Sequence, residues 1–519
     1  MNTPKRFPRI PLVIILVTIG SMVFVRSLPE FERNLKSWLM AGIPLLSSLL
    51  LFLWFLFTKR YTGRTRLIGL AVATVLVLGL KAAVKVDGTI DGTGAPNLVW
   101  KWSAPNQSQA PKIESSVADE SLVPAFDPRL VDAADVPQFF GPARDGTVKE
   151  TKLAREWKTT PPRELWRQPI GQGWSAYSVV KGLAYTQEQR GEDELITCYE
   201  LLSGTLIWAH ADKAHFSQWQ GGDGPRATPT IDQGKLYAFG ATGLLNCLDA
   251  ATGKPVWQRS VLTENKLTNI EWGVSASPLV FEDKVIITGG NPKGPVLFAY
   301  HRETGQPLWK AGDDQATYAS PILATIAGKR VILSNDAKAL NGYDPTTGAV
   351  VLTHVWGGDK WPKASQPVIL SKDQIFLSAG YGMGCQLIRI KAETDGKLTA
   401  EEVWSGMKMK TQFNSPALLG GHLYGLDDGR LACIDIASGD RLWKEGRFAS
   451  GQSLLVGDLI IVQNESGSVH LCAAKTQGFE EFGKIEALSS KTWNHPVLAG
   501  RYLLVRNDRE AVCYELPVK

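Results

Sequence analysis

The sequence predicts an all-β protein: an eight-bladed β-propeller preceded by an N-terminal transmembrane helical region and a tether. Three observations predict it, namely a repeated turn phrase, a regular series of hairpins, and three apolar stretches near the start of the chain. The phrase is clearest in residues 245–257 (LNCLDAATGKPVW), and its copies lie 43 to 52 residues apart except where a degenerate copy intervenes. A repeat of that period is typical of solenoids and propellers.

In each of five copies a Gly is followed four residues later by a large apolar residue. We expect the Gly to take a left-handed position in a hairpin turn, and the large residue to anchor the outgoing strand. The copies are Gly204 with Trp208, Gly253 with Trp257, Gly305 with Trp309, Gly348 with Leu352, and Gly439 with Trp443.

The number of blades follows from the strands that precede each turn phrase. Eight second strands begin between Gly182 and Gly500, and first strands often open with Pro, as at Pro278 and Pro416. The last blade lacks an outgoing strand, whereas Arg163 to Trp166 form an outgoing strand without a blade. We expect the two to pair and close the ring, because closure removes the exposed sheet edges.

Five of the six cysteines fall at one position of the blade. Other blades carry Ala299, Gly342 and Arg389 there, and Cys385 lies elsewhere. Equivalent positions on different blades are too far apart for a disulfide, so we expect buried thiols. The seven scattered histidines and the absence of CxxC spacing predict no metal site. The shared cysteines are Cys198, Cys247, Cys433, Cys472 and Cys513.

Residues 1–85 form the predicted membrane region, with three transmembrane helices over 10–25, 38–57 and 67–84. A cleavable signal peptide is the alternative for the first stretch, but no small-x-small site follows it. Positive residues are more numerous on the side of the N-terminus, which predicts a cytoplasmic N-terminus and an extracytoplasmic propeller, in the bacterial inner membrane and periplasm.

Charge disfavours a nucleic-acid partner. Residues 1–85 carry 12 Lys and Arg against two Glu, a balance of +10, whereas the remainder carries 44 against 49. The basic excess therefore belongs to the membrane region, not to the propeller. Residues 86–137, rich in Pro, Ser, Asp and Ala, predict an extended linker that reaches on the order of 40 Å, and the propeller is expected over 138–519.

The turn phrase resembles the repeat of the pyrroloquinoline quinone (PQQ)-like β-propeller superfamily. Its members include quinoprotein dehydrogenases and the propeller lipoprotein of the outer-membrane β-barrel assembly machine. The resemblance covers about residues 160–519, and Pro137 to Gly146 (PQFFGPARDG) looks like the FxGPxxxG opening motif of membrane-tethered relatives. The resemblance implies the fold but no particular chemistry, because the same blades hold enzymes and scaffolds.

Loops between blades carry an aromatic residue shortly before the first strand in seven of eight cases. Such a ring around the mouth suits binding of a peptide, sugar or quinone, because aromatic side chains give large contact area at little entropic cost. The alternative is that these residues fill the gaps between blades. They are Trp174, Trp219, Trp272, Tyr318, Trp361, Phe413 and Trp493.

Two further sets of residues bear on a site. Positive charge at the same rim is a candidate feature, with solvated surface lysines as the favoured interpretation: Lys363, Lys408, Lys410 and Lys491. A calcium and quinone site needs carboxylate and amide oxygens near a stacking Trp, and the nearest candidates are Asn269, Glu271, Trp272 and Asn414.

The favoured hypothesis is a noncatalytic scaffold that binds protein partners or envelope components through its loop face and carries no cofactor. The alternative is a PQQ- and calcium-dependent membrane quinoprotein dehydrogenase that oxidises an alcohol or sugar. The thin set of candidate ligands, and the lack of the adjacent Cys pair found in the family's alcohol dehydrogenases, favour the scaffold. Membrane glucose dehydrogenases of the family also lack that pair, which keeps the enzyme hypothesis open.

Overall fold

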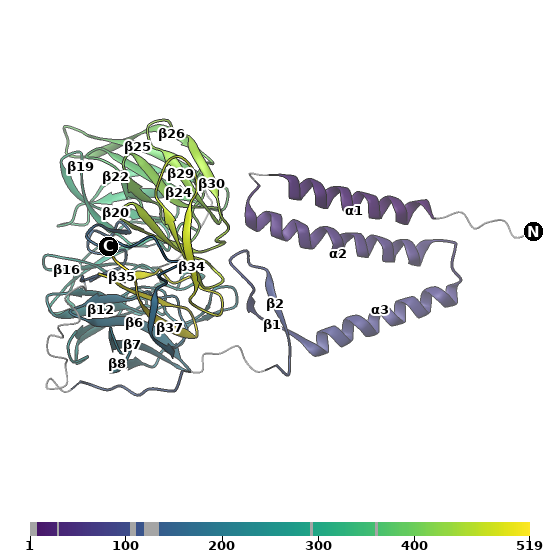
Figure 1. Cartoon of the computed structure of the whole chain (residues 1–519), viewed down its shortest axis with the longest axis horizontal. Helices are drawn as coiled ribbons and strands as arrows, with labels where there is room; N and C mark the ends of the chain where they lie inside the picture. Colours follow the sequence, from purple (N-terminus) through teal and green to yellow (C-terminus); the bar gives the residue numbers. More distant parts are fainter. Residues whose placement is uncertain (1–7, 29–30, 104–109, 119–133, 291–293, 359–361) are drawn as a thin grey trace, which may run out of the picture. The chain divides into compact units, whose positions relative to one another are not determined.

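The computed structural model describes residues 8–28, 31–103, 110–118, 134–290, 294–358 and 362–519. Two compact units divide the chain, residues 1–106 and 107–519. In the first unit, three helices are long and apolar enough to cross a membrane (Figure 1): α1 (Arg9–Ser27), α2 (Arg33–Phe57) and α3 (Gly63–Ala83). They begin and end within a few residues of the predicted spans. α2 starts five residues earlier because its helix continues through polar residues that hydropathy excludes.

A hairpin replaces the first part of the predicted linker, so the expectation of an extended chain over 86–137 was wrong there. β1 (Val84–Thr89) pairs antiparallel with β2 (Pro96–Trp100). Later in the same stretch, Ser116 bridges Ala209 of the propeller, and the amide of Ala118 donates to Thr252. The composition of the segment does not predict this pairing, because Ser116 pairs with the free edge of a blade's outer strand that is distant in sequence.

Within the described residues, the second unit contains eight four-stranded antiparallel blades, as predicted. The first three blades are β5 (Ser178–Val180), β6 (Leu183–Arg190), β7 (Asp193–Glu200), β8 (Leu206–Asp212); β11 (Thr230–Asp232), β12 (Lys235–Phe239), β13 (Leu244–Asp249), β14 (Pro255–Ser260); and β15 (Leu279–Phe281), β16 (Lys284–Thr288), β17 (Leu297–His301), β18 (Pro307–Ala311). A small hairpin, β9 (Ser217–Gln218) with β10 (Gly222–Asp223), and the short helix α4 (Val261–Glu264) lie in loops.

The next three blades follow the same order. They are β19 (Ile322–Ile326), β20 (Lys329–Asn335), β21 (Ala339–Tyr343), β22 (Val350–Val355); β23 (Val368–Ile369), β24 (Gln374–Ala379), β25 (Gly384–Ala392), β26 (Leu398–Gly406); and β27 (Ala417–Leu419), β28 (His422–Asp427), β29 (Arg430–Asp435), β30 (Arg441–Glu445).

The seventh blade is β31 (Gln452–Val456), β32 (Leu459–Gln463), β33 (Ser468–Ala473) and β34 (Glu481–Glu486), to which the short β3 (Thr147–Val148) adds in parallel. The eighth is β35 (Val497–Ala499), β36 (Tyr502–Arg506) and β37 (Glu510–Glu515), completed by β4 (Arg163–Pro169). The predicted closure of the ring is therefore confirmed.

The turn phrase fastens each blade to the next. The φ angle of Gly253 is 75°, as expected for the left-handed turn position. A Cβ there would lie only 2.6 Å from Trp208 of the preceding blade, whose indole donates to the carbonyl of Ala250 at 3.1 Å. The tryptophan thus anchors the neighbouring blade rather than its own strand alone, and glycine is needed for the close approach as well as for the turn.

The cysteine slot is confirmed for four of the five cysteines, each of which lies opposite the Trp that anchors the outgoing strand: Cys198, Cys247, Cys433 and Cys513. The assignment of Cys472 was wrong, because Cys472 lies past the bulge opposite Glu481 and Leu471 takes the slot. Cys198 pairs with Trp208 across the hairpin, and the same register in the fifth blade pairs Leu387 with Trp404. The assignment of Arg389 to this slot was wrong, because the longer hairpin β25–β26 shifts the register by two residues. All six cysteines are free and buried, and burial raises the pKa of the Cys433 thiol to about 11, so these are unreactive packing residues.

Candidate functional site: the aromatic loop face

Short polar side chains hold the loops between blades in place around the propeller axis. Each of these loops joins an outer strand to the inner strand of the next blade. Near the start of that inner strand, a side-chain hydroxyl or amide forms a hydrogen bond with the adjacent blade. The series includes Ala176 N to Thr228 Oγ1 (3.2 Å), Thr228 N to Ser277 Oγ (2.9 Å), Ser277 N to Ser320 Oγ (2.9 Å) and Gln366 N to Ser415 Oγ (3.0 Å).

Three of the predicted aromatic residues meet at one side of this face. The ring of Trp493 lies 4.7 Å from that of Trp174 and 5.3 Å from that of Phe413. The Lys491 ammonium lies over both indoles, at 4.4 Å from Trp493 and 5.7 Å from Trp174. We call these four residues the Trp174 cluster. All four are half-buried, so part of each side chain faces solvent.

The Trp174 cluster forms because the seventh blade has no aromatic residue at this position. Phe413 precedes the sixth blade and Trp493 the eighth, and Gln452 between them donates to the carbonyls of both, at 2.9 and 3.0 Å. The buried Glu465 accepts from the Trp493 indole at 2.6 Å. The sequence analysis missed Gln452 and Glu465, since their role depends on three blades meeting.

A second aromatic pair lies on the other blades. The rings of Trp272 and Tyr318 are 5.5 Å apart, and the Tyr318 hydroxyl accepts from the Trp272 amide at 3.3 Å. The loop 216–226 runs between the two groups: the carbonyl of Gly221 accepts from the Trp174 indole at 2.5 Å, and a Cβ on Gly221 would lie 3.0 Å from Trp272. Both aromatic groups therefore contact this loop.

The remaining aromatic residues differ in exposure. Trp219, between β9 and β10, leaves 51% of its surface exposed. The predicted Trp361 lies outside the described residues. The structure thus brings Trp174, Phe413 and Trp493 together, pairs Trp272 with Tyr318, and leaves Trp219 at the solvent.

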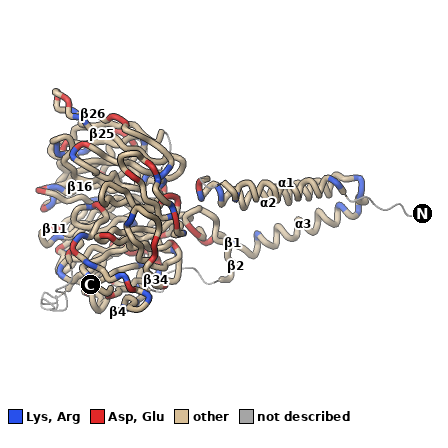
Figure 2. Tube along the Cα trace, turned by 45° about the horizontal axis from the view of Figure 1, so that its top comes forward, with Lys and Arg blue, Asp and Glu red and all other residues tan. Residues whose placement is uncertain are grey.

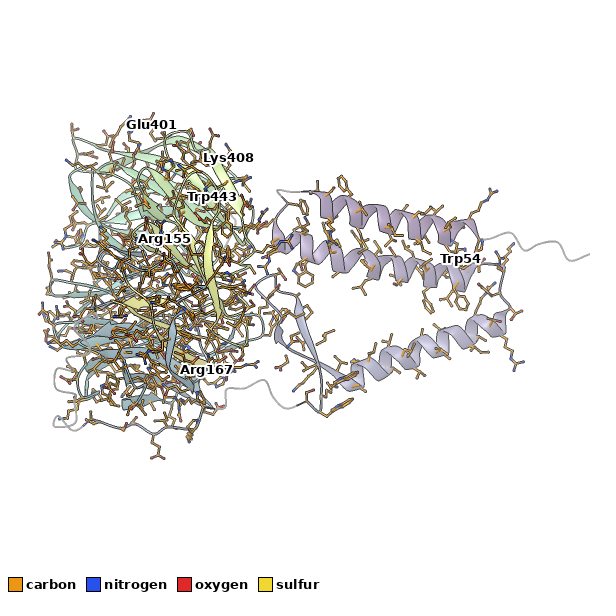
Figure 3. All side chains as sticks on the ribbon, in the orientation of Figure 1. Trp54, Arg155, Arg167, Glu401, Lys408 and Trp443 are labelled. Carbon is orange, nitrogen blue, oxygen red and sulfur yellow. The ribbon has the colours of Figure 1, made fainter. Side chains whose placement is uncertain are left out.

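The expectation of four solvated lysines at this rim was wrong for two of them. Lys363 is fully buried, donates to the carbonyl of Asp336 at 3.1 Å and lies 5.1 Å from the Trp356 ring. This burial lowers the pKa of Lys363 to about 8. Lys410 is also buried and lies 3.2 Å from Asp427. The sequence does not show that Asp336 and Asp427 lie next to these lysines, so it predicts a solvated position for a lysine in a loop. Lys408 is exposed and pairs with Asp440 at 2.6 Å (Figure 3).

The calcium and quinone candidates bond to different parts of the backbone. Both ends of the Asn414 amide bond to the backbone of Leu426, at 3.2 and 3.5 Å. The side-chain amide of Asn269 donates to the Ala241 carbonyl at 2.7 Å, and the Oδ1 of Asn269 is buried without a hydrogen-bond partner. Glu271 is exposed. The Oδ1 of Asn414 already accepts one hydrogen bond from the Leu426 amide, and the set offers only one carboxylate and two amide side chains. These residues do not fit a preformed ion site.

Among the described residues, no group of three or more His, Cys, Asp or Glu is arranged to hold a metal ion. Burial shifts the pKa of single groups in this region. Arg226, which packs over the Phe216 ring at 4.5 Å and donates to Gly222 O at 2.7 Å, has its pKa lowered to about 10 by desolvation.

The opposite end of the inner strands is covered by residues 134–151, which we call the closing segment. Its Val136 bridges Val179 of the first blade, and β3 pairs with β31 of the seventh. Between these points Arg144 donates to the carbonyls of Ser277 and Pro278 at 3.1 and 3.0 Å. The segment therefore crosses the ring. Arg144 is buried without a carboxylate partner, and desolvation lowers its pKa to about 9.

Aromatic rings of the closing segment are buried against the eighth blade. Phe140 contacts Phe139 at 4.0 Å and His495 at 4.5 Å between ring centroids. Burial lowers the pKa of His495 to about 4, and its Nε2 lies 3.1 Å from the carbonyl of Ser453. A cavity of about 220 Å³ adjoins these residues. The opening motif resemblance identified this segment but not its path across the ring.

Comparison with known proteins supports the fold and gives two kinds of relative. The family described as outer membrane protein assembly factor BamB matches residues 192–445. The BamB protein of Shewanella oneidensis is 23% identical over 299 residues, which cover 54% of this chain and 71% of that protein. The quinohemoprotein alcohol dehydrogenase ADH-IIG of Pseudomonas putida is 25% identical over 228 residues, 40% of this chain but only 31% of the enzyme.

Solved structures show the same fold. The BamB structure from Moraxella catarrhalis aligns with a TM-score of 0.51 and 16% identity, over 68% of this chain and all of that one. The quinohemoprotein alcohol dehydrogenase from Comamonas testosteroni aligns with a TM-score of 0.54 and 13% identity, over 76% and 83%. The predicted resemblance to the PQQ-like β-propeller superfamily is confirmed, and the relatives include both assembly factors and enzymes.

Proposed function

We propose that this protein is a membrane-tethered, extracytoplasmic β-propeller that acts as a noncatalytic scaffold and binds protein partners or envelope components through its loop face. The observation that carries the proposal is the Trp174 cluster, in which three aromatic rings and a lysine from different blades meet and stay partly exposed. Partly exposed, clustered aromatic residues are the side chains that dominate binding energy at protein interfaces.

Chemistry of the cluster favours a particular kind of partner segment. The indoles and Phe413 offer apolar surface, and Lys491 places a positive charge beside it. A segment that combines apolar side chains with an acidic residue satisfies both. The exposed Trp219 extends the apolar surface on a neighbouring loop.

The membrane location rests on α1, α2 and α3 and on the distribution of charge. Lys59, Arg60, Arg64 and Arg66 join Lys5, Arg6 and Arg9 on the side of the N-terminus, seven cations against five on the other side for residues 1–85. The positive-inside rule then places the N-terminus in the cytoplasm and the propeller in the periplasm of a bacterial inner membrane. Among the described residues of the first unit, Lys and Arg gather toward the ends of the helices (Figure 2). The bacterial BamB relatives support an envelope location.

A quinoprotein dehydrogenase is the second candidate function, favoured by the similarity to quinohemoprotein alcohol dehydrogenases. It needs PQQ held with calcium, for which the candidate oxygen ligands are Asn269, Glu271 and Asn414, with Trp272 as the stacking residue. The hydrogen bonds that occupy the Asn414 amide weigh against this function.

Crosslinking in membranes tests the scaffold function. The variant Trp174→Ala/Trp493→Ala of the full-length protein should lose the partners that the wild type captures, with its thermal unfolding temperature lowered only slightly. The control Val256→Ser/Leu308→Ser alters two exposed apolar residues on outer strands and should capture as the wild type does. Equal capture by the wild type and the tryptophan variant would reject the Trp174 cluster as the binding site.

Calorimetric titration of the full-length protein with PQQ, with and without calcium, separates the two functions. No binding is expected. Near-stoichiometric, calcium-dependent binding would favour the dehydrogenase, and the heat should then disappear in the Asn269→Ala variant.

A further inference from the structure

The hairpin β1–β2 continues directly from the third apolar helix. α3 ends at Ala83 and β1 begins at Val84, with no loop between them. A helix of 21 residues is about 31 Å long, which matches the hydrocarbon core of a bilayer, about 30 Å thick. When α3 spans the membrane, as in the proposed function, the hairpin therefore begins where the chain leaves the hydrocarbon.

The far end of the hairpin is held at the start of α2. Asp91, in the turn, accepts a hydrogen bond from Arg33 at 2.9 Å, and the indole of Trp38 donates to the carbonyl of Thr93 at 3.0 Å. The hairpin thus connects the last residue of α3 with the first turns of α2 (Figure 1). Because these two helix ends lie on the same side of a membrane, the strands run along its surface.

One face of the hairpin is apolar and exposed. Val86 pairs with Leu98, and Val84 with Trp100, and directly opposed residues of an antiparallel pair share a face. Val86, Leu98 and Trp100 leave 53%, 64% and 50% of their surface exposed. Trp102 stacks on Trp100, with centroids 5.2 Å apart and planes 6° from parallel, and is itself 72% exposed.

The other face of the hairpin is mostly polar, with Val99 opposite Lys85 as its apolar residue. Lys85 and Asp87 alternate with the apolar residues of β1, and Asn97 lies between Pro96 and Leu98 in β2. A two-stranded hairpin is marginally stable in water by itself, and an exposed apolar face of this kind needs a cover.

Two observations identify the cover as lipid. Tryptophan is enriched at the level of the lipid headgroups, where its ring contacts acyl chains and its N–H remains hydrated. Cations that attract anionic headgroups lie at the same helix ends or on the hairpin. These are Arg26, Arg33, Lys36, Lys81, Lys85 and Lys101.

We propose that the apolar face of β1–β2, formed by Val86, Leu98, Trp100 and Trp102, lies in the interfacial layer of the membrane that α1, α2 and α3 span. The hairpin then acts as a flat second anchor and holds the exit point of the chain at the membrane surface. This inference rests on the membrane topology of the proposed function, but not on the Trp174 cluster.

Spin labels on the full-length protein in bilayers of phosphatidylethanolamine and phosphatidylglycerol test the proposal. A nitroxide at Leu98→Cys should collide several-fold more with oxygen, which concentrates in lipid, than with a water-soluble nickel chelate. The adjacent Asn97→Cys, on the polar face, should show the reverse. Val86→Cys, opposite Leu98, should repeat the Leu98 result, and the six native cysteines are buried, so the wild type measures background labelling.

Three outcomes would overturn the proposal. Equal nickel collision at positions 97 and 98 would place the apolar face in water. Protection of position 98 from both reagents would mean that protein covers it, either the propeller or a second copy of the chain. A label at Val75→Cys, in α3 and 68% exposed, shows whether the helices themselves lie in the membrane. If this label does not collide preferentially with oxygen, the proposed membrane topology is wrong as well. If it does, only the proposal for the hairpin is wrong.

Discussion

The two ends of the propeller axis both carry aromatic residues, yet the structure treats them in opposite ways. At the loop end, Trp174, Phe413 and Trp493 touch each other and remain partly exposed. At the other end, Phe140 of the closing segment is 7% exposed and packs on His495.

The difference shows that the cover, not the residue type, sets the role of an aromatic side chain here. Residues 134–151 cross one end of the propeller and shield the aromatic side chains of this segment from water. The burial of these side chains contributes to stability. At the loop end, the loop 216–226 contacts Trp174, yet the rings of the Trp174 cluster keep exposed surface for a partner.

The largest expected effect is on the closed end. Phe140→Ala should lower the free energy of unfolding by about 3–5 kcal/mol, because it leaves a cavity against Phe139 and His495. Thermal unfolding of the full-length protein, followed by near-UV circular dichroism, measures the change. Trp219→Ala, an exposed aromatic control, should change the unfolding temperature little. A loss below about 1 kcal/mol for Phe140→Ala would show that the closing segment does not seal this end.

Acidification should also destabilise the closed end. The folded-state pKa of His495 is lowered to about 4 from 6.5 by burial, so the unfolded chain binds a proton first as the pH falls. Stability present above pH 6.5 is therefore lost progressively toward pH 4, by about 3 kcal/mol in all. Denaturant unfolding at pH 7, 5.5 and 4.5 should show a steeper decline for the wild type than for His495→Gln. Parallel declines would contradict the burial of a neutral imidazole.

A smaller effect is expected at the loop end. Trp174→Ala and Trp493→Ala, made singly, should each lower the free energy of unfolding by about 1 kcal/mol, since each ring is only partly buried. The same denaturant titration measures this loss. If either variant lowers the free energy of unfolding as much as Phe140→Ala does, the main role of the cluster is to fill the gap between blades. The proposed difference between the two ends would then be wrong.

The smallest effect should come from the lysine. Lys491→Gln should lower the free energy of unfolding by no more than about 0.5–1 kcal/mol, the contribution of a cation over an aromatic ring at an exposed site. It should weaken partner capture a few-fold, because the positive charge that complements an acidic partner residue is lost. Capture by the wild type should decline more steeply with added salt than capture by the variant, whereas Lys491→Arg should behave as the wild type. The same salt dependence in all three proteins would exclude a role for this charge.

Local sequence patterns predicted the fold because each blade repeats the same requirements. The Gly-x-x-x-Trp spacing gave the hairpin register, and the unmatched strand at Arg163 gave the closure with β37. The error at Arg389 arose where a longer hairpin interrupts that spacing. The linker prediction failed in part because β1–β2 has too few residues to show a strand pattern, and because Ser116 pairs with a distant strand edge.

The candidate site was only partly predictable. The aromatic residues before the inner strands could be counted from the sequence, but the grouping of Trp174 with Phe413 and Trp493 depends on Gln452 of a third blade. Lys363 and Lys410 were misplaced because their acceptors come from elsewhere in the fold.

By itself the sequence determined the blade number, the ring closure, the slot of four cysteines and the three apolar helices, because each follows from patterns of residues a few positions apart along the chain. The tertiary structure alone decided which aromatic rings are covered, which lysines are buried, and that Arg144 reaches the backbone of Ser277 and Pro278. These features depend on contacts between residues far apart in the chain, and no local pattern encodes the burial that those contacts impose.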